Sequence, residues 1–279
     1  MRFIKYLLAI LSLIYTAYSN EYDFKNYTVV DGLSESTINV IFEDDKGFLY
    51  IGTENGLGLF DGLTFFNYKM NVFNETTIFG NNIKSICQDD YGDIWVGTEL
   101  GLSKLDTRTR KFERITKTKY NLKDIEKIFN DKNGNIWFRN SDGIYKYEQA
   151  LNEVECISCG ENLEINSFSN IYSTHSNEIL ISTFSNLYRY DFDSDTLRSM
   201  LNSNNSTIEI SFVTDIIEID NTLWIGSKNG LIKLPYDPKL KPQVFKEKTS
   251  SLVNDDIRDI EYSKKKNEIW ISTKNGISI

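Results

Sequence analysis

The residue types that most often carry out chemistry are few in this sequence. His175 is the one histidine among 279 residues, so a nucleophilic or zinc site built on several histidines is excluded. The acidic pairs Asp44/Asp45 and Asp89/Asp90 have the residue types of a general acid and base, but they recur at one place in a repeated turn. We therefore interpret them as structural, with calcium binding by such a turn as the alternative.

One stretch, Gly92 to Leu102, returns along almost the whole chain. When its copies are aligned, one large residue forms a column that contains all four tryptophans of the protein. The column consists of Tyr50, Trp95, Trp137, Leu180, Trp224 and Trp270, at steps of 45, 42, 43, 44 and 46 residues. A period of about 40 to 50 residues with one aromatic residue and one glycine turn per unit is typical of propeller blades.

Each unit divides into four short strands. The first carries an apolar pair three residues apart, such as Ile83 and Ile86, and a turn rich in Asp, Asn and Gly follows. These residues supply the positive φ and the local hydrogen bonds of a tight turn. The second strand holds the column residue, as in Ile94 to Thr98, and the third and fourth run from Gly101 to Asp106 and from Lys111 to Ile115.

A small sheet of four strands cannot bury both its faces alone, but sheets stacked radially can. We therefore predict an all-β fold, a β-propeller of four-stranded antiparallel blades with about six visible repeats, five complete and one truncated. The column residues are expected to pack between blades. The competing fold is a β-solenoid, whose units are shorter and lack this four-strand rhythm.

Two units depart from the repeat. In the fourth, Leu180 replaces the aromatic residue. In the third, Arg139 stands where other units have Gly52, Gly97 or Gly226. A long cation at that place must emerge from the blade or find a partner.

The charge balance limits the choice of partners. The formal net charge is −9, which argues against nucleic acid as a partner, because such binding needs basic side chains that neutralise phosphates. Contact with an anionic membrane surface is disfavoured for the same reason.

The N-terminus has the three parts of a secretory signal peptide. Arg2 and Lys5 are basic, Tyr6 to Tyr15 is apolar, and Ala17-Tyr18-Ser19 is a small-x-small cleavage site. We predict a signal peptide over residues 1–19, a propeller domain over residues 20–279 and export from the cytoplasm. The alternative is an uncleaved anchor, although the apolar run is short for a membrane span. No later segment has the pattern of a membrane helix.

The three cysteines suggest structure rather than catalysis. Cys156 and Cys159 form a C-x-x-C motif, which in an exported chain indicates a local disulfide or two free thiols. A disulfide would require the chain to turn there, because cysteines three apart on a straight strand are too distant. Cys87 occupies a first-strand position that is phenylalanine in other units, so it is expected in the core. We expect no metal and no cofactor.

The repeats resemble the two-component regulator propeller family, whose units read approximately I-x-x-I-x-x-D-x-x-G-x-L-W-I-G-T-x-x-G-L. The second unit carries this resemblance from Ile83 through Asp89, Gly92 and Trp95 to Leu102, and looser copies extend from Phe24 to Ile279. Asp31-Gly32-Leu33-Ser34 also resembles the segment with which such sensors begin.

The resemblance implies the periplasmic, non-catalytic sensor part of a hybrid two-component receptor. Such a receptor works as a dimer, responds to a glycan outside the inner membrane and relays the signal to a histidine kinase that is not in this chain. It also implies a ring of seven blades, so we expect the propeller to be incomplete at its C-terminus. The chain would then be a fragment of a longer receptor or a truncated gene product.

Ligand recognition is expected at the end of the propeller where the turns between second and third strands lie. Arg139 and Asn140 are the predicted ligand-binding residues, because an arginine in place of the glycine can pair with a carboxylate or sulfate of an acidic oligosaccharide. The alternative for Arg139 is a salt bridge to a neighbouring blade.

Two other functions remain open. One is an exported propeller that serves as a protein-interaction scaffold without a signalling partner in the same chain. The other is a propeller enzyme such as a glycan lyase or hydrolase. An enzyme would require paired carboxylates at places that do not follow the repeat, whereas the acids here follow it.

Overall fold

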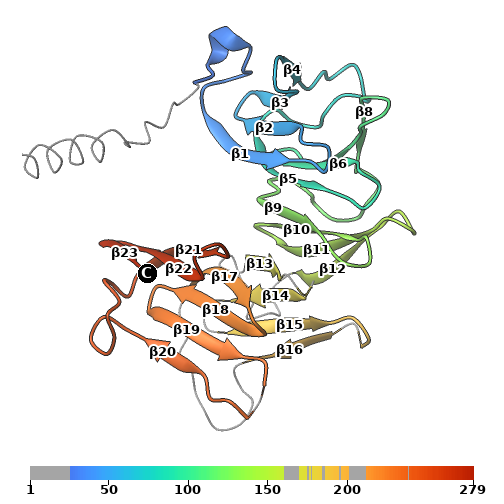
Figure 1. The fold of residues 1–279 in the computed structure, drawn as a ribbon. Coiled ribbons are helices and arrows are strands. Elements are labelled where there is room, and N and C mark those ends of the chain that lie inside the picture. The colour runs from blue at the N-terminus through green and yellow to red at the C-terminus, as the bar shows by residue number, and fades with distance from the viewer. Residues whose placement is uncertain are drawn as a thin grey trace, which may run out of the picture.

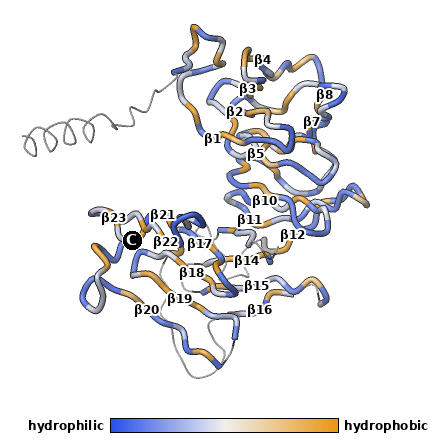
Figure 2. Tube along the Cα trace, in the orientation of Figure 1, coloured by the Kyte–Doolittle hydropathy of each residue, from blue (hydrophilic) through white to orange (hydrophobic). Residues whose placement is uncertain are grey.

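The computed structural model describes residues 26–279 except 160–169, 175, 177, 184–185, 195, 201–211 and 238. Six small antiparallel sheets follow one another around an arc (Figure 1). Along the strands hydrophobic and hydrophilic residues alternate, and the connecting turns are largely hydrophilic (Figure 2). The predicted signal peptide of residues 1–19 and His175 lie outside the described residues.

The first three blades each contain four strands in sequence order, after a short 3-10 turn η1 (Val29–Asp31). Blade 1 consists of β1 (Ile38–Glu43), β2 (Leu49–Thr53), β3 (Gly56–Phe60) and β4 (Phe65–Tyr68). Blade 2 consists of β5 (Ile83–Gln88), β6 (Ile94–Thr98), β7 (Leu102–Asp106) and β8 (Lys111–Arg114). Blade 3 consists of β9 (Lys127–Asn130), β10 (Ile136–Asn140), β11 (Gly143–Glu148) and β12 (Glu153–Cys159).

The last three blades repeat the arrangement, and the sixth has three strands among the described residues. Blade 4 consists of β13 (Asn170–Ser173), β14 (Ile179–Ser182), β15 (Leu187–Asp191) and β16 (Thr196–Ser199). Blade 5 consists of β17 (Val213–Ile219), β18 (Thr222–Ser227), β19 (Gly230–Pro235) and β20 (Gln243–Phe245). Blade 6 consists of β21 (Ile257–Ser263), β22 (Glu268–Thr273) and β23 (Gly276–Ser278). The predicted all-β propeller fold is confirmed, with five sheets of four strands and one of three among the described residues. The number of blades in a closed ring stays a prediction.

The first aspartate of each repeated turn organises the hairpin around it. Oδ1 of Asp89 accepts hydrogen bonds from the backbone N–H groups of Tyr91 and Asp93, each at 3.0 Å. Its other oxygen, Oδ2, accepts the indole N–H of Trp95 at 2.9 Å. Asp131 and Trp137 repeat this bond at 2.7 Å. The structural role predicted for these acids is therefore confirmed at Asp89.

The second aspartate of the turn links one blade to the next. Gln88 donates through Nε2 to Asp45 Oδ1 at 2.8 Å, and the Asp45 N–H donates back to Gln88 Oε1 at 2.9 Å. Asn130 likewise donates through Nδ2 to Asp90 Oδ1 at 2.7 Å. The acidic pairs thus serve the hairpin and the blade junction together.

In blades 1, 2 and 5 the glycine two residues after the column residue allows the next blade to approach. A Cβ placed on Gly97 would lie 2.6 Å from Ile125 Cγ2, where Ile125 is the first residue of the apolar pair of blade 3. Gly52 meets Ile83 at 2.6 Å and Gly226 meets Ile257 at 2.7 Å in the same way. Because real Cβ atoms do not approach so closely, only glycine fits there with this packing.

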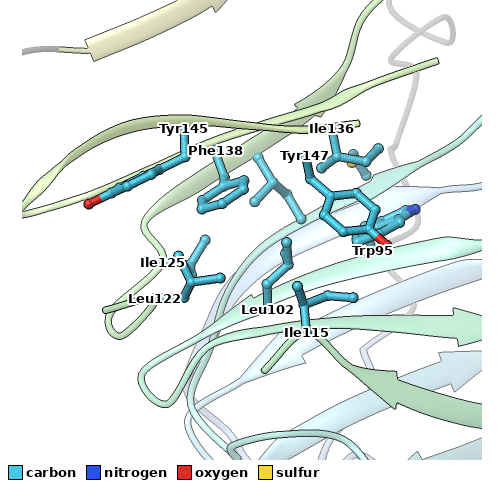
Figure 3. Packing of buried hydrophobic residues seen from close by; sticks show 11 residues of the cluster. Trp95, Leu102, Ile115, Leu122, Ile125, Ile136, Phe138, Tyr145 and Tyr147 are labelled. Carbon is cyan, nitrogen blue, oxygen red and sulfur yellow. The ribbon is translucent and has the colours of Figure 1, made fainter. Parts of the chain in front are cut away.

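The tryptophan column packs between blades, as predicted. Trp95 is fully buried, and its ring centroid lies 5.1 Å from that of Tyr147 in blade 3. Trp137 meets Tyr190 of blade 4 edge to face at 4.8 Å. Figure 3 shows how Trp95, Leu102 and Ile115 of blade 2 face Phe138 and the other apolar residues of blade 3. Cys87 belongs to this cluster, so its predicted burial is confirmed.

One pair of first-strand residues is exposed although its counterparts are buried. Ile38 and Ile41 of β1 are 38% and 63% exposed, whereas Ile83 and Ile86 of β5 are 0% and 6% exposed. In blade 2 these positions pack on the preceding blade. Among the described residues no sheet packs on this side of blade 1, so its apolar pair faces solvent.

Removing a column residue should cost most where blades meet on both sides. We expect Trp95→Ala to lower the free energy of unfolding by about 3 to 5 kcal/mol, the usual range for a buried aromatic residue. Trp270→Ala is the matched control, because Trp270 is only half-buried and should cost clearly less. Equal losses for the two variants in denaturant unfolding would contradict inter-blade packing as the source of the stability.

Filling the glycine site should force two blades apart. We expect Gly97→Ala to cost about 1 to 3 kcal/mol through overpacking against Ile125. Gly58→Ala is the control, because a Cβ there would meet only the Asn67 side chain at 3.3 Å and Ile51 beyond 3.5 Å. Thermal unfolding measures both, and a Gly97→Ala protein as stable as Gly58→Ala would refute the close contact.

Candidate functional site at the junction of blades 3 and 4

The junction between blades 3 and 4 departs from the others because two cations lie opposite each other on β9 and β10. Arg139 occupies the glycine position, and Lys127 lies directly opposite it in the pairing of β9 with β10. Opposite residues of an antiparallel pair project from the same face. By the register of Gly52 and Gly97, that is the face turned towards blade 4.

Arg139 forms an ion pair with Glu126, which precedes β9 in the same blade. The two side chains are 21% and 37% exposed, so the pair is reached by solvent. The alternative predicted for Arg139 was a salt bridge to a neighbouring blade. The described ion pair is with its own blade.

Lys127 lies over the ring of Tyr172 in blade 4, with its Nζ 4.5 Å from the ring centroid. A cation at this distance is attracted by the face of the ring. Burial lowers the pKa of Lys127, and the nearby Arg139 lowers it further, while Asp215 acts in the opposite direction. No carboxylate oxygen lies within ion-pair distance of Lys127 among the described residues.

Asp215 of blade 5 is the acidic member of the group. Its Oδ2 accepts the backbone N–H of Ile260 at 3.1 Å, which joins blade 5 to blade 6. Burial raises the pKa of Asp215 and Asp259 raises it further, while the Ile260 N–H and Lys127 lower it. Asp215 is thus a partly desolvated carboxyl near both a like charge and an opposite one.

Tyr172 contacts Lys127 of blade 3 and is hydrogen-bonded to blade 5. Its hydroxyl accepts a hydrogen bond from Asn170 Nδ2 at 3.1 Å and donates to the Val213 carbonyl at 3.4 Å. Burial is the main cause that raises the pKa of Tyr172 to about 12, so the hydroxyl stays protonated at neutral pH.

Asn140, the second predicted binding residue, is 4% exposed and builds the turn after β10. Its Nδ2 donates to the carbonyls of Asn121 and Lys123 at 2.9 and 3.0 Å, and its Oδ1 accepts the N–H groups of Asp142 and Gly143. In blade 2 the hydroxyl of Thr98 has the same role. A ligand bound by Asn140 would have to replace these bonds.

This arrangement combines an arginine, a lysine, an aromatic ring and a carboxyl from three blades. Guanidinium and ammonium groups pair with carboxylates and sulfates, and Tyr172 and Asp215 add groups suited to hydroxyls. Sequence reasoning identified Arg139 and Asn140 but missed Lys127, Tyr172 and Asp215. The available signal for Lys127 and Asp215 was the first-strand position opposite the glycine column, which reads Val40, Ser85, Lys127, Asn170, Asp215 and Asp259.

The other sequence candidates stay apart from this group. Cys156 in β12 is disulfide-bonded, and the side chain of Cys159 lies outside the described residues. In the part of the chain that the structure describes, no three His, Cys, Asp or Glu side chains are grouped as metal ligands.

Comparison with known proteins shows which family has similar repeats. Residues 32–55 and 77–99 match the two component regulator propeller family. These segments contain the first-strand pairs, aspartate turns and column residues of blades 1 and 2. Blades 1 and 2 thus carry repeats similar to those of the two component regulator propeller family.

A relative of this propeller chain is a histidine kinase. "Histidine kinase P4" of Formosa agariphila is 39% identical over 72 residues, which are 26% of this chain and 5% of that protein. The propeller chain therefore spans only a small part of the length of this relative.

Several solved structures share the propeller fold at low identity. PorZ, a surface component of the type-IX secretion system of Porphyromonas gingivalis, is 16% identical with a TM-score of 0.62, covering 86% of this chain and 38% of PorZ. An extracellular domain from B. thetaiotaomicron, described as part of a hybrid two component system, is 18% identical with a TM-score of 0.55, covering 87% and 38%. Virginiamycin B lyase of Staphylococcus aureus is 11% identical with a TM-score of 0.61, covering 93% and 84%.

At these identities the likenesses establish the fold alone, and they include both a sensor-type domain and an enzyme. Within the described residues, no helix has the length and apolar character needed to cross a membrane.

The raised pKa of Asp215 has a consequence for stability. Its folded pKa lies above the ordinary value of 3.8, so the unfolded chain releases this proton first and the wild-type protein loses stability as pH rises from 3.8 through the folded value. Asp215→Asn keeps an acceptor for the Ile260 N–H and removes the charge. Its stability relative to wild type should therefore rise across this pH window.

Denaturant unfolding at several pH values measures this difference. Glu261→Gln, which removes an exposed carboxyl of β21, is the control for loss of one carboxyl. A difference between Asp215→Asn and wild type that does not change with pH would show that burial of Asp215 has no energetic effect.

Proposed function

We propose that this chain is the ligand-sensing propeller part of a hybrid two-component receptor. It lies outside the inner membrane, in the periplasm, responds to an oligosaccharide, and relays the signal to a histidine kinase elsewhere in a longer protein. The family match and the 39% identity to a histidine kinase over 72 residues support this proposal. The propeller itself is non-catalytic and acts as part of a homodimer.

The cationic junction supports an acidic glycan as the ligand. Arg139 and Lys127 face blade 4 together, and one carboxylate, Glu126, is paired with Arg139. A carboxylate or sulfate on a sugar would compete with Glu126 for the guanidinium and offer Lys127 a charged partner. Asn140 would position the turn beside Arg139 rather than lose its own hydrogen bonds.

A panel of oligosaccharides tests the assignment by thermal shift and calorimetry. We expect an acidic oligosaccharide to stabilise the protein and Arg139→Ala to weaken its binding about tenfold, the loss of one charge-assisted contact of about 1.4 kcal/mol. Arg108→Ala is the control, because that side chain is 82% exposed in the turn after β7. Asn140→Thr, which restores the residue type of Thr98, should leave binding nearly unchanged.

Two outcomes would contradict the proposal in different ways. If no glycan stabilises the wild-type protein, carbohydrate sensing is wrong. If glycans bind equally to wild type and Arg139→Ala, the site at the junction is wrong while glycan sensing stands.

An exported scaffold is the second candidate function. The exposed Ile38 and Ile41 of β1 favour it, because apolar pairs on a sheet face usually meet a protein partner. This role is favoured over sensing if the protein binds no glycan but associates with another protein through β1, and if Ile41→Lys abolishes that association.

A further inference from the structure

A polar pocket lies between blades 1 and 2, away from Arg139, at the end of the sheets where β1 turns into β2. Its volume is about 370 Å³, within the usual range for small-ligand sites. Its lining includes Asp44, Tyr50, Leu59, Phe66, Tyr68 and Arg110. Its lining residues come largely from the turns after β1, β3 and β7.

The pocket exists because blade 1 lacks two side chains that fill the same place in blade 2. In blade 2, Trp95 donates its indole N–H to Asp89 Oδ2 at 2.9 Å. Lys104 lies opposite Trp95 and places its Nζ 3.2 Å from the same oxygen. Blade 1 has Tyr50 in place of the tryptophan and Leu59 in place of the lysine.

Leu59 is exceptional in its column. The residue opposite the column position is a cation in the next four blades, namely Lys104, Lys146, Arg189 and Lys233. These cations contact the carboxylates or rings beside them, as Lys146 does with Glu155 at 2.7 Å and Lys233 with the Trp224 ring at 5.2 Å. Leucine can make no such contact with Asp44.

Asp44 is therefore a nearly buried carboxylate with one uncommitted oxygen. It is 7% exposed, and its Oδ1 accepts the N–H groups of Lys46 and Phe48 at 3.0 and 2.8 Å. Among the described residues no donor is hydrogen-bonded to its Oδ2. A carboxylate oxygen without a protein donor can accept a hydrogen bond from a ligand, and this one belongs to a residue that lines the pocket.

Two tyrosine hydroxyls and one guanidinium complete the polar lining. Tyr50 and Tyr68 are 3% and 9% exposed, and neither hydroxyl is hydrogen-bonded to another described residue. Burial, followed by the Asp44 carboxylate, raises the pKa of Tyr50, so its hydroxyl remains a donor. Arg110, at φ 57° in the turn after β7, holds its guanidinium 5.3 Å from the Phe66 ring centroid.

The charges of the lining favour a neutral ligand. The acids Asp44 and Asp61 are balanced by Lys46 and Arg110, so neither an anion nor a cation gains a net attraction. The polar groups comprise an acceptor at Asp44, a donor at Arg110 and hydroxyls of both kinds. A ring with several hydroxyls satisfies both, because each hydroxyl donates one hydrogen bond and accepts others, and the aromatic rings cover its apolar face.

We propose that the pocket between blades 1 and 2 binds a neutral polyhydroxylated ring, a monosaccharide or one sugar unit of a glycan, with Asp44, Tyr50 and Arg110 as its polar contacts. The choice of a sugar rests on the proposed glycan sensing, whereas the pocket rests on the replacement of tryptophan and lysine by Tyr50 and Leu59. The site is separate from the cationic junction and takes an uncharged unit.

The test refills the pocket with the side chain that the other blades carry. Leu59→Lys should place an ammonium on Asp44 as Lys104 does on Asp89, and so block the ligand without loss of fold. Leu59→Met is the matched control, because it keeps the apolar character and adds no charge. The probes are D-glucose, D-galactose, D-mannose and L-arabinose, titrated into the full chain by calorimetry.

We expect at least one of these sugars to bind the wild-type protein and Leu59→Met. Binding should weaken tenfold or more in Leu59→Lys, whose melting temperature stays equal to or above that of wild type. If Leu59→Lys does not fold, Asp44→Asn serves instead, because its Oδ1 can still accept both turn N–H groups. That variant should weaken binding by a similar factor.

The contrary outcomes separate this proposal from the proposed function. Sugar binding that is unchanged in Leu59→Lys and Asp44→Asn overturns the pocket and leaves glycan sensing intact. The pocket is likewise overturned, and glycan sensing stands, if the protein binds only acidic oligosaccharides and Arg139→Ala abolishes that binding. If methylamine binds to the pocket and none of the sugars does, the ligand class is wrong. If the protein binds neither neutral nor acidic sugars, both proposals are wrong.

Discussion

The stacking of blades depends on one close contact, in which the first isoleucine of a blade fills the space where the preceding blade has no Cβ. Ile83, Ile125 and Ile257 meet glycines in this way. With the inner strands held this near, the column residues reach the next sheet, and Trp95 and Trp137 become fully buried. The aspartate turns then satisfy the indole N–H groups that burial would otherwise leave unpaired.

The same constraint explains why the informative places are the departures from the repeat. At the junction of blades 3 and 4 the glycine is Arg139, so the close contact is replaced by a long cation that pairs with Glu126. Lys127, opposite Arg139, places its ammonium over the ring of Tyr172 in blade 4. Two charged side chains therefore lie at this junction, where the junctions after blades 1, 2 and 5 have a glycine packed against an isoleucine. The neighbouring blades contribute the ring of Tyr172 and the carboxyl of Asp215.

Blade 1 departs in another way, through the size and charge of two side chains and not through the backbone. Tyr50 and Leu59 keep the strand pairing of the other blades, yet together they remove an indole N–H and an ammonium from the neighbourhood of Asp44. The hairpin around Asp44 is unaffected, because it uses the other carboxylate oxygen. Asp44 can therefore hold its turn with one oxygen and leave the other for a ligand. At Asn140, in contrast, both ends of the side-chain amide are used by the turn.

The sequence by itself determined the period, the four strands of each unit, the column between blades and the structural role of the turn acids. These features are set by alternation, turn residues and recurrence, which are local properties repeated six times. It also indicated Arg139, because a break in a repeat is visible in one chain. Only the tertiary structure decided that Arg139 pairs within its own blade and that Lys127, Tyr172 and Asp215 lie near one another. It alone also decided that Tyr50 and Leu59 leave a pocket over Asp44. These relations join residues on different strands and blades, and they depend on register and side-chain reach, which no local pattern specifies.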